Sequence, residues 1–551
     1  MAGRERRTVG RLIADAVAAA GVRWAFTVPG ESFLELLDAL PAAGVTVIAT
    51  RHEGGASFMA EAVGQLTGQP AAVLGTRAVG AANMSIGIHT ARSNSTPMVA
   101  LVGQVARSNL GREAFQESDL VATFGGLAKW AAQIDDPAAA AALLGEGLSL
   151  MRSGRPGPVL FALPEDVLGG PVPARAQVSV APVAPPAPDG AAVDAVLALL
   201  AAAKRPVILA GGGVLAAGAR DDLVALSERL AVPVMAAWRR PTAFPNNHAN
   251  YLGMTGYGAP GSVRTRLDEA DALLVIGSRL NEIATFDYRI LRPRQPWAHV
   301  DLAPRSEPVA GLRRATIALT ADAGAFLRAA LERSRTYKPP KTRQASLKAD
   351  RAAYLAASAL PEDPVWRGPG VSPAHVINVL QRIAPANSII TTDAGNFGLW
   401  LARGFRFGPD HAFLGPTSGA MGYGLPAAIA ASLVAPDRPV IALVGDGGLA
   451  MTMSELETCV RTGAHPVVLA FDNRRYGTIA MHQRNDGRAE TATALGPIDF
   501  AAIARAMGAQ GGRVTRDAEF EPALRDALRA ERPALLHLEV DPSWVTPDRH
   551  G

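Results

Sequence analysis

The residues with the clearest potential for chemistry follow an apolar stretch in the last third of the chain. Residues 439–448 read PVIALVGDGG, a strand pattern that leads directly into Asp446 and its flanking glycines. We expect a helix from about Met453, and then a second apolar strand at 466–471 that ends just before Asn473. If these strands are parallel neighbours, Asp446 and Asn473 lie at adjacent carboxyl ends, where their oxygens can share one ion.

This pair of side chains suits a hard cation. Mg²⁺ takes oxygen ligands at about 2.1 Å and usually completes its shell with phosphate oxygens. Gly447 and Gly448 would let backbone N–H groups approach such phosphates, and a helix N-terminus would add a favourable potential. The motif therefore predicts a diphosphate–metal site. The alternative for the short motif alone is a tight strand-to-helix turn without a ligand.

The elements that must position this site fall into three sections. Pro- and Ala-rich residues 180–190 and polar, Pro-containing residues 335–344 are typical of linkers. The predicted domains are 1–180, 190–335 and 355–551. In each domain short β-rich runs alternate with longer Ala/Leu-rich runs; the clearest strand candidates are 207–210, 272–276 and 440–444. This alternation predicts an α/β fold built of doubly wound parallel sheets covered by helices.

Composition and charge exclude several classes of function. The 551 residues are 48% hydrophobic and 19% charged, which is typical of a globular protein. The 54 Lys and Arg residues are interspersed with 50 Asp and Glu residues and leave a net charge of only +4, so we expect no nucleic-acid binding. The apolar stretch 191–203 is interrupted by Asp194 and falls far short of the roughly 20 residues of a membrane span, so we expect no membrane association.

Two further features bear on the cellular compartment. Cys459 is the single cysteine, which excludes an intrachain disulfide framework and fits a reducing compartment. Arg4, Arg6 and Arg7 could begin an export signal, but charged residues interrupt the apolar region that such a signal needs. We therefore expect a cytoplasmic protein.

The spacing of the metal motif resembles a family signature. Twenty-five residues, 448–472, separate Gly447 from Asn473. This is similar to the signature of thiamine-diphosphate-dependent enzymes, GDG followed after about 25 residues by N. The resemblance implies that the Mg²⁺ ligands are the side chains of Asp446 and Asn473 and the backbone oxygen of Arg475. Tyr476 follows in the same segment and is expected at the cofactor.

A second, independent sequence motif lies near the N-terminus. Residues 51–56 read RHEGGA, which resembles the H-E-x-x-A segment of the same family. The resemblance implies that Glu53 bonds N1′ of the cofactor's aminopyrimidine. A carboxylic acid in an apolar pocket can exchange a proton with N1′ and so prepare N4′ to remove the proton from thiazolium C2. Alone, Glu53 would more often be a solvated helix residue.

Two glycine-containing turns complete the expected cofactor site. Residues 419–426 read GAMGYGLP, and the resemblance implies that Met421 wedges between the two cofactor rings while the carbonyl of Gly419 receives the N4′ amino group. Alone, Met421 would be taken as a core-filling residue. Residues 393–396 end another expected strand, and the resemblance implies that Gly395 and Asn396 contact a phosphate.

Over nearly the whole chain the sequence is similar to the large, catalytic subunit of acetolactate synthase. The resemblance implies a pyrimidine-binding first domain, a central domain and a diphosphate-binding third domain, with decarboxylation of pyruvate and transfer of the two-carbon unit to a second carbonyl. It places Phe115, Gln116 and Lys129 on the approach to C2, Met254 in a shared segment, and Arg279 on the carboxylate of the acceptor 2-oxoacid. A guanidinium suits a carboxylate, although an arginine equally often makes a surface ion pair.

The departures from that family concentrate where substrate is chosen. His482 stands where the synthases carry a tryptophan that favours the larger acceptor, so acceptor choice is open. Glu31 follows Pro29 and Gly30 where the synthases have two glycines. A carboxylate facing C2 would repel an anionic donor unless it were protonated, so Glu31 is either an additional acid/base or a sign of another substrate. It could also simply be a charge at a helix N-terminus.

The cofactor of the central domain and the assembly follow from the same resemblance. Gly211 to Gly213 follow a strand as in the FAD-binding domain of the synthases, but the run after Arg279 is LNEIA instead of FDDRV, so FAD stays open. Because Glu53 and the metal site lie in different domains, which in this family belong to different subunits, we expect a homodimer or homotetramer.

Other reactions on the same scaffold share these residues. A 2-oxoacid decarboxylase, a hydroxyketone lyase and a 1,2-diketone hydrolase, acting on 2-oxoacid, aldehyde or ketone substrates, would all keep Glu53, Asp446, Asn473 and Met421. A catalytically silent, cofactor-binding regulatory protein is a further alternative, against which the intact Glu53 argues.

Overall fold

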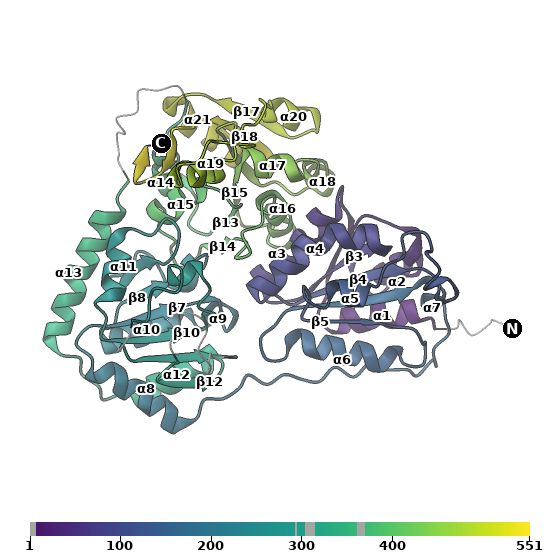
Figure 1. The fold of residues 1–551 in the computed structure, drawn as a ribbon, viewed down its shortest axis with the longest axis horizontal. Helices are drawn as coiled ribbons and strands as arrows, with labels where there is room; N and C mark the ends of the chain where they lie inside the picture. Colours follow the sequence, from purple (N-terminus) through teal and green to yellow (C-terminus); the bar gives the residue numbers. More distant parts are fainter. Residues whose placement is uncertain (1–6, 293–294, 304–313, 361–369, 551) are drawn as a thin grey trace.

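The chain folds into three α/β domains arranged around a common junction (Figure 1). The structure, a computed structural model, describes residues 7–292, 295–303, 314–360 and 370–550. Each domain is built on a six-stranded sheet whose described pairings are all parallel. The predicted α/β fold with three parallel-sheet domains is confirmed. The arginines at 4 and 6 that could begin an export signal lie outside the described residues.

The first domain has the strand order β2-β1-β3-β4-β6-β5. Successive residues of β3 face opposite sides: Val73 packs against one core cluster, and Ala72 and Leu74 pack against the other. The sheet is therefore buried on both faces, as a parallel sheet requires. The elements are α1 (Val9–Ala19), β1 (Trp24–Thr27), η1 (Glu31–Phe33), α2 (Leu34–Ala42), β2 (Thr46–Ala49), α3 (Glu53–Thr67), β3 (Ala71–Thr76), α4 (Arg77–Asn94), β4 (Met98–Gln104), η2 (Arg107–Asn109), α5 (Leu120–Phe124), β5 (Trp130–Gln133), α6 (Ala140–Arg152), β6 (Pro158–Pro164) and α7 (Glu165–Leu168).

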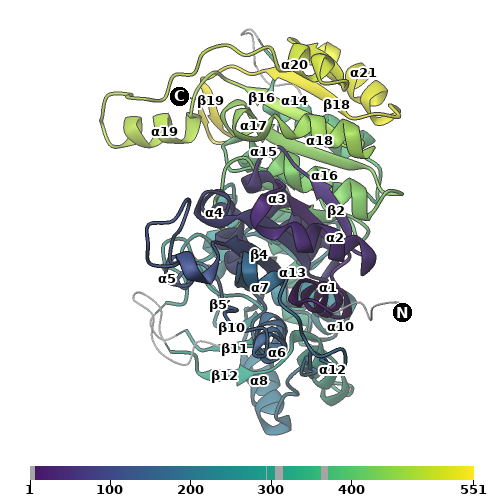
Figure 2. The same cartoon turned by 90° about the vertical axis from the view of Figure 1, so that its right-hand side faces the viewer.

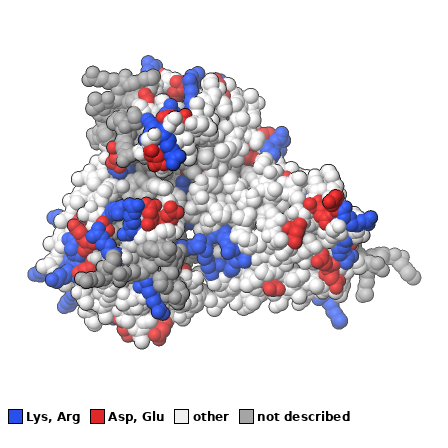
Figure 3. Space-filling model, viewed as in Figure 1, with Lys and Arg blue, Asp and Glu red and all other residues white. Residues whose placement is uncertain are grey.

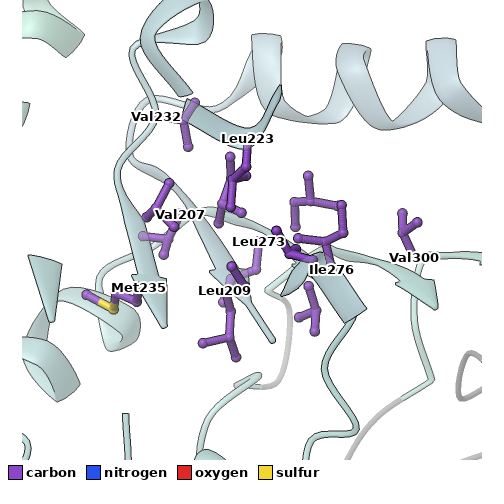
Figure 4. Packing of buried hydrophobic residues seen from close by; sticks show 14 of the residues in the cluster. Val207, Leu209, Leu223, Val232, Met235, Leu273, Ile276 and Val300 are labelled. Atoms are coloured by element: carbon purple, nitrogen blue, oxygen red, sulfur yellow. The ribbon is translucent and has the colours of Figure 1, made fainter. Parts of the chain in front are cut away.

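The second domain follows residues 177–189, which contain no helix or strand. Its sheet order is β12-β11-β10-β7-β8-β9, and its core is a cluster of buried hydrophobic residues around β7 and β10 (Figure 4). The elements are α8 (Gly190–Ala202), β7 (Pro206–Ala210), α9 (Gly212–Ala216), α10 (Arg220–Leu230), β8 (Val234–Ala236), η3 (Pro241–Ala243), β9 (Tyr251–Met254), α11 (Gly261–Asp268), β10 (Ala272–Ile276), η4 (Ile283–Thr285), β11 (Trp297–Asp301), β12 (Ile317–Thr320), α12 (Ala323–Arg333) and α13 (Lys341–Ser358).

Helix α13 begins inside the stretch predicted as a linker. Two prolines precede it and fix the chain at the helix start, after which Ala, Lys, Arg and Leu favour the helix. It packs on the second domain: the guanidinium of Arg343 donates to the carbonyls of Leu230 and Leu200, and Tyr354 joins the second core. Residues 341–358 are thus part of the second domain's structure and do not act as a spacer.

The third domain has the strand order β14-β13-β15-β16-β18-β17, with a separate antiparallel pair, β19–β20, near the C-terminus. Figure 2 shows α19 extending outward from the body of this domain. The elements are α14 (Pro373–Ile383), β13 (Ile389–Thr392), α15 (Phe397–Gly404), β14 (Ala412–Leu414), α16 (Gly424–Val434), β15 (Val440–Gly445), α17 (Asp446–Thr452), α18 (Glu455–Thr462), β16 (Val467–Asp472), α19 (Gly477–Asn485), α20 (Phe500–Ala506), β17 (Gln510–Val514), α21 (Asp517–Leu528), β18 (Ala534–Glu539), β19 (Trp544–Thr546) and β20 (Arg549–His550).

The first and third domains share one hydrophobic core. Helix α3 packs against α16, and a single buried cluster continues from the first sheet through these helices to β15 and β16. The relative position of the two domains is therefore set by close-packed apolar contact. Among the described helices, none is long and apolar enough to cross a bilayer.

Candidate active site

Three neighbouring strands of the third sheet end where the metal motif was predicted. Strands β13, β15 and β16 are adjacent, and the register that pairs Gly445 with Phe471 sets Asp446 beside Asp472. The helix expected from about Met453 is α18, which begins at Glu455, and a short helix that was not expected, α17, starts at Asp446 itself. Gly445 is extended and serves as the N-cap, and the Asp446 carboxylate in the first turn favours the positive end of the helix.

Asp446 is almost fully buried and incompletely hydrogen-bonded. Its relative exposure is 7%, and among the described residues its Oδ2 has no hydrogen-bond partner. Burial, together with the neighbouring carboxylate of Asp472, raises the pKa of Asp446. Burial acts to raise the pKa of Asp472, but the hydrogen bond to His537 Nε2, 2.8 Å away, and the hydrogen bond from the Arg474 N–H together hold that pKa below its ordinary value. A divalent cation would relieve the electrostatic strain at Asp446.

The segment after β16 lies against the glycines after β15. A β-carbon on Gly447 would come within 2.6 Å of the Tyr476 ring, and one on Gly477 would come within 2.9 Å of Asn473 Nδ2. Asn473 Oδ1 accepts the Arg475 N–H at 3.3 Å, and the Arg475 carbonyl accepts the Gly477 N–H at 2.9 Å. A carboxylate, an amide and a backbone carbonyl are therefore gathered at one edge, and these oxygen donors fit Mg²⁺.

The donor set differs from that of a zinc or iron site. In the described part of the chain no three His, Cys, Asp or Glu side chains gather as potential metal ligands. Clusters of three or more His, Cys, Asp or Glu side chains are typical of transition-metal sites. Mg²⁺, in contrast, needs only a few protein oxygens and completes its coordination shell with phosphate oxygens. The residues present therefore fit a metal–diphosphate group better than a free-standing metal centre.

The turn after β13 completes this edge of the third sheet. Asn396 Oδ1 accepts a hydrogen bond from the Thr478 hydroxyl at 2.8 Å, which links the 393–396 turn to α19. Gly395 precedes Asn396 at the partly exposed start of α15. A β-carbon on Gly448 would lie 2.0 Å from Asp393 Oδ2, so only glycine fits there. The turns that carry Asn396 and Gly448 therefore lie side by side.

Asp393 is a charged residue of this site that the sequence motifs did not single out. It is fully buried, its Oδ1 accepts the Tyr423 N–H at 2.9 Å, and Oδ2 has no partner among the described residues. Burial raises the pKa of Asp393 to about 6. Its position directly after a predicted strand could have identified it, because ligands bind at the carboxyl edge of a parallel sheet.

The loop before α16 joins this edge to the first domain. Gly419 has a φ of +75°, which favours glycine, and Met421 is partly exposed on the same loop. Tyr423 donates its hydroxyl to Glu61 of α3 at 2.6 Å, while its N–H bonds Asp393. The loop that carries Met421 is thus tied to the first domain through Tyr423, and Met421 itself is not fully buried.

Glu53 opens helix α3 and is 8% exposed. Its Oε2 accepts a hydrogen bond from Asn83 Nδ2 of α4 at 2.9 Å. His52 caps the helix, because its Nδ1 accepts the Gly54 N–H at 2.9 Å. The acid is therefore held by neighbours at both its side chain and its backbone and is not a solvated helix residue.

A second glutamate that the sequence motifs did not single out supports this helix start. Glu455 of α18 is fully buried and accepts the N–H groups of Arg51 at 3.1 Å and His52 at 3.0 Å. A β-carbon on Gly55 would lie 2.5 Å from its Oε1. Burial raises the pKa of Glu455. In sequence it looks like an ordinary helix residue, since its partners lie about 400 residues away.

Glu31, Phe115 and Gln116 gather at the carboxyl edge of the first sheet around Arg77, an arginine to which the sequence analysis assigned no role. Arg77 Nη1 lies 3.1 Å from Glu31 Oε1, and the guanidinium carbon lies 5.8 Å from the centre of the Phe115 ring. The Gln116 carbonyl accepts the N–H of Ala78 at 3.1 Å. Phe115 is 72% exposed within the single chain.

Two predicted substrate residues are placed away from this edge. Lys129 precedes β5 and so lies at the amino edge of the sheet, where its Nζ donates to the carbonyls of Leu150, Ser153 and Arg155. These three bonds use all of its donors. Met254 ends β9 and is 8% exposed within the core of the second domain. Within this chain Lys129 does not line the approach to C2, and Met254, predicted as a substrate residue, is a core residue of the second domain.

Two more predicted substrate residues lie elsewhere in the chain. His482 has an exposed side chain on α19, the helix that extends outward in Figure 2. Arg279 lines a cavity of about 1420 Å³ at the junction of the three domains. Gly211 to Gly213 line the same cavity, as do Arg155 and Arg240. Figure 3 shows Lys and Arg side chains gathered where the first and second domains meet.

The glycines of this cavity are explained by packing between two turns. A β-carbon on Gly211 would lie 2.3 Å from the Gly277 carbonyl oxygen, and one on Gly213 would lie 2.6 Å from the Gly277 α-carbon.

The cavity is also crowded with positive charge. Burial, followed by the neighbouring Arg279 and Arg92, lowers the pKa of Arg155 to about 9. An anionic ligand would relieve this repulsion.

Comparison with known families covers all three domains. Residues 7–123 match "Thiamine pyrophosphate enzyme, N-terminal TPP binding domain", residues 193–330 match the central domain of the same enzymes, and residues 393–538 match their C-terminal TPP binding domain. The three matches correspond to the three sheets.

Individual relatives are similar over almost the whole chain. A probable acetolactate synthase large subunit of Methanocaldococcus jannaschii is 32% identical over 97% of this chain and 92% of that protein. The acetolactate synthase large subunit of Parasynechococcus marenigrum is 31% identical over 96% of this chain and 86% of that protein. A sulfoacetaldehyde acetyltransferase of Castellaniella defragrans is 29% identical over 96% of this chain and 92% of that protein.

Proposed function

The chain belongs to the thiamine pyrophosphate enzyme family, and from this premise we propose that it is a carboligase of 2-oxoacids most like acetolactate synthase. In this reaction pyruvate is decarboxylated and its two-carbon unit is joined to a second carbonyl compound. The similarity to synthase large subunits over nearly the full chain supports the choice of reaction. The observation that carries the site is the meeting of Asp446, Asn473 and the Arg475 carbonyl beside Gly447 and Gly448.

Bound thiamine diphosphate would supply a nucleophilic carbon and an electron sink. Asp446, Asn473 and the Arg475 carbonyl would hold Mg²⁺, and the backbone around Gly447, Gly448, Gly395 and Asn396 would receive the diphosphate, with Tyr476 beside it. Replacing Asp446 by alanine should abolish Mg²⁺-dependent cofactor binding. Equal cofactor affinity with and without Mg²⁺ in the wild-type protein would contradict the metal site.

Residues of the first and third domains would bind the cofactor rings and line the approach to C2. Glu53 would hold and exchange the proton at N1′ of the aminopyrimidine, and Asn83 would keep its carboxyl group in place. Gly419 and Met421 would orient the two rings from the loop before α16. Gln116 and Phe115 would line the approach to C2, since they gather with Glu31 at the carboxyl edge of the first sheet.

FAD is the candidate ligand for the cavity of the second domain. The size of the cavity, its position at the carboxyl ends of β7 and β10, and its crowded arginines favour a ligand that carries phosphate. The glycine run that suggested FAD is required by packing against Gly277, so it does not by itself identify a flavin. The absorbance spectrum of the purified protein, with and without added FAD, tests this assignment.

A homo-oligomer is the working assembly in this proposal. Large apolar side chains are exposed on the single chain beside the candidate site: Val79 (48%) and Ile86 (38%) on α4, and Met451 (51%) on α17. A partner subunit that covers them would remove this apolar surface from water. The dimer would also bring Glu53 of one subunit toward the metal site of the other, as the resemblance implies.

The proposed reaction is tested by following all products by NMR after the protein is incubated with thiamine diphosphate, Mg²⁺ and pyruvate, with and without a second 2-oxoacid. Acetolactate formation would establish the synthase activity. Acetaldehyde alone would indicate a decarboxylase. Cofactor binding without pyruvate turnover would contradict the proposal. Hydroxyketone cleavage and diketone hydrolysis would then be assayed, and Glu31 would be the first residue to substitute in order to explain the different substrate.

A further inference from the structure

Arg77 lies among the residues that gather around Glu31, Phe115 and Gln116 at the predicted approach to C2. We propose that Arg77 determines substrate specificity by binding the carboxylate of a 2-oxoacid, and that Glu31 occupies this binding position in the free enzyme. This inference rests on the proposed function and names the group that recognises the substrate's charge. Arg279, the residue predicted to hold the acceptor carboxylate, lines the cavity at the junction of the three domains. Lys129, the other cation predicted at the approach to C2, is bound to three carbonyls.

The position of Arg77 on α4 connects it to the proposed acid. Arg77 is the first residue of the helix, and Gly80 and Asn83 follow within the next two turns, about 60° and 120° around the helix axis from it. A β-carbon on Gly80 would lie 3.2 Å from Glu53 Oε1, and Asn83 Nδ2 donates to Glu53 Oε2 at 2.9 Å. The first two turns of α4 therefore carry both Arg77 and the contacts to Glu53.

The backbone holds Arg77 in an unusual conformation. Its φ is +44°, a left-handed value that is uncommon for a residue with a β-carbon. Such conformations persist only where the surroundings impose them, and they cluster at functional sites. Here the loop that carries Glu31 packs closely against Thr76, the residue before Arg77. Ser32 Oγ lies 2.7 Å from Thr76 Oγ1, and a β-carbon on Gly30 would come within 2.5 Å of Thr76.

The Arg77 guanidinium lies between two glutamates, of which Glu31 is the more exposed. The Arg77 side chain is only 10% exposed; Nη2 bonds Glu165 Oε2 at 3.1 Å, and the buried Nε has no hydrogen-bond partner among the described residues. Nη1 faces Glu31, whose side chain is 59% exposed. Glu31 lies in a three-residue 3₁₀ helix without a side-chain cap. Exposed ion pairs are only weakly favourable, so a substrate carboxylate can replace Glu31.

The charge of the cluster explains why Glu31 competes with an anionic substrate. Glu31 and Glu165 contribute two negative charges and Arg77 one positive charge, so the three residues sum to −1. A 2-oxoacid must displace one carboxylate to gain a favourable contact. A planar guanidinium suits a carboxylate, and Phe115 packs over it as an apolar cover. Removing Glu31 should therefore favour anionic substrates, and removing Arg77 should disfavour them.

The test measures binding separately from turnover. Calorimetry is carried out on the Glu53→Gln protein loaded with thiamine diphosphate and Mg²⁺, so that no reaction follows, with pyruvate as the anionic ligand and 2,3-butanedione as its neutral counterpart. We expect Arg77→Gln to weaken pyruvate binding about tenfold or more and to change dione binding less than about twofold. We expect Glu31→Gln to tighten pyruvate binding about threefold or more.

The matched control is Arg107→Gln, which removes another arginine near the same edge of the first sheet, paired with Asp166 at 2.8 Å. It should leave both affinities unchanged. Circular dichroism checks folding, and if Arg77→Gln does not fold, Glu31→Gln decides the question. Unchanged pyruvate affinity in the folded variants, or equal effects on both ligands, overturns the role of Arg77. Pyruvate turnover by the wild-type enzyme reports the proposed function independently.

Discussion

Individual residues of the candidate site are held by contacts that restrict their chemistry. Glu53 is buried and bonded to Asn83, so its carboxyl group has one orientation. Asp446 and Asp393 each keep a buried oxygen without a partner in the described structure. Buried polar groups are normally satisfied, and exceptions call for a ligand or a strained functional role. These three residues are therefore the most informative to change.

Glu53→Gln separates cofactor binding from proton transfer. Glutamine preserves the size of the side chain and can still contact Asn83, so we expect thiamine diphosphate and Mg²⁺ to bind within about twofold of wild type. Exchange of the C2 proton, followed by NMR in deuterated buffer after rapid acid quenching, should fall by about 10²-fold or more. Unchanged exchange in the variant would refute the role proposed for Glu53.

Asp393→Asn should change how stability depends on pH. Burial raises the pKa of Asp393 to about 6 in the folded state. A carboxyl group with a raised folded pKa contributes stability fully below its unfolded pKa of about 4, and this contribution is lost as the pH rises through about 6. Between pH 5 and pH 7 the free energy of unfolding of the cofactor-free wild type should therefore fall by about 1 kcal/mol more than that of Asp393→Asn.

Asparagine suits this test because its amide oxygen can still accept the Tyr423 N–H. Urea unfolding at the two pH values gives the comparison, and Asp410→Asn, which removes an exposed carboxylate, is the control. Parallel pH dependence in wild type and Asp393→Asn would show that Asp393 is not the titrating group.

At the scale of elements, the site is built by helices that meet across domains. Helix α3 begins at Glu53, and α18 of the third domain supplies Glu455 to the two N–H groups just before it. Helix α17 begins at Asp446, and α4 places Asn83 on Glu53. The free N–H groups before a helix must find acceptors, and here the acceptor comes from another domain.

Glu455→Ala should loosen the start of α3. It leaves the N–H groups of Arg51 and His52 without their acceptor in a buried place, which should lower the free energy of unfolding by roughly 2–4 kcal/mol and slow C2 proton exchange through Glu53. Glu455→Gln keeps an acceptor oxygen and should recover most of both properties. Thermal unfolding and the exchange assay measure the two effects; an alanine variant as stable and active as wild type would contradict this support.

At the scale of the whole molecule, the first and third domains share a core while the second is joined to them around a large cavity. Apolar side chains are exposed on α4 and α17, as the proposed homo-oligomer would require of a single chain. In a dimer the site would contain Glu53 from one subunit and Asp446 from the other. This arrangement can be tested without a structure of the complex.

Two inactive variants should complement each other. Glu53→Gln and Asp446→Ala should each be inactive alone, but a mixed dimer formed by unfolding and refolding them together contains one intact site. Random pairing should restore roughly a quarter of wild-type activity. Size-exclusion chromatography checks that dimers form, and refolded single variants are the controls. Dimers that form without any recovered activity would show that Glu53 and Asp446 act within one chain.

The sequence by itself determined the features that are local. Apolar runs that end in glycine and acidic residues predicted β15 and β16, and their parallel pairing sets Asp446 near Asn473 as expected. The alternation of strand and helix patterns predicted three parallel sheets, because each run carries its own periodicity. The spacing between Gly447 and Asn473 indicated the family because it, too, can be read directly along the chain.

Only the tertiary structure decided the contacts between distant segments. Glu455 looks like an ordinary helix residue until its partners at Arg51 and His52 are known. Glu31 could be an acid, a helix charge or a repelling group until Arg77 is found 3.1 Å away. Lys129 and Met254 have the right types for a substrate site, but the sheet places one at its amino edge and the other in a core. Pairings of this kind depend on how separate domains pack, and no local pattern encodes that packing.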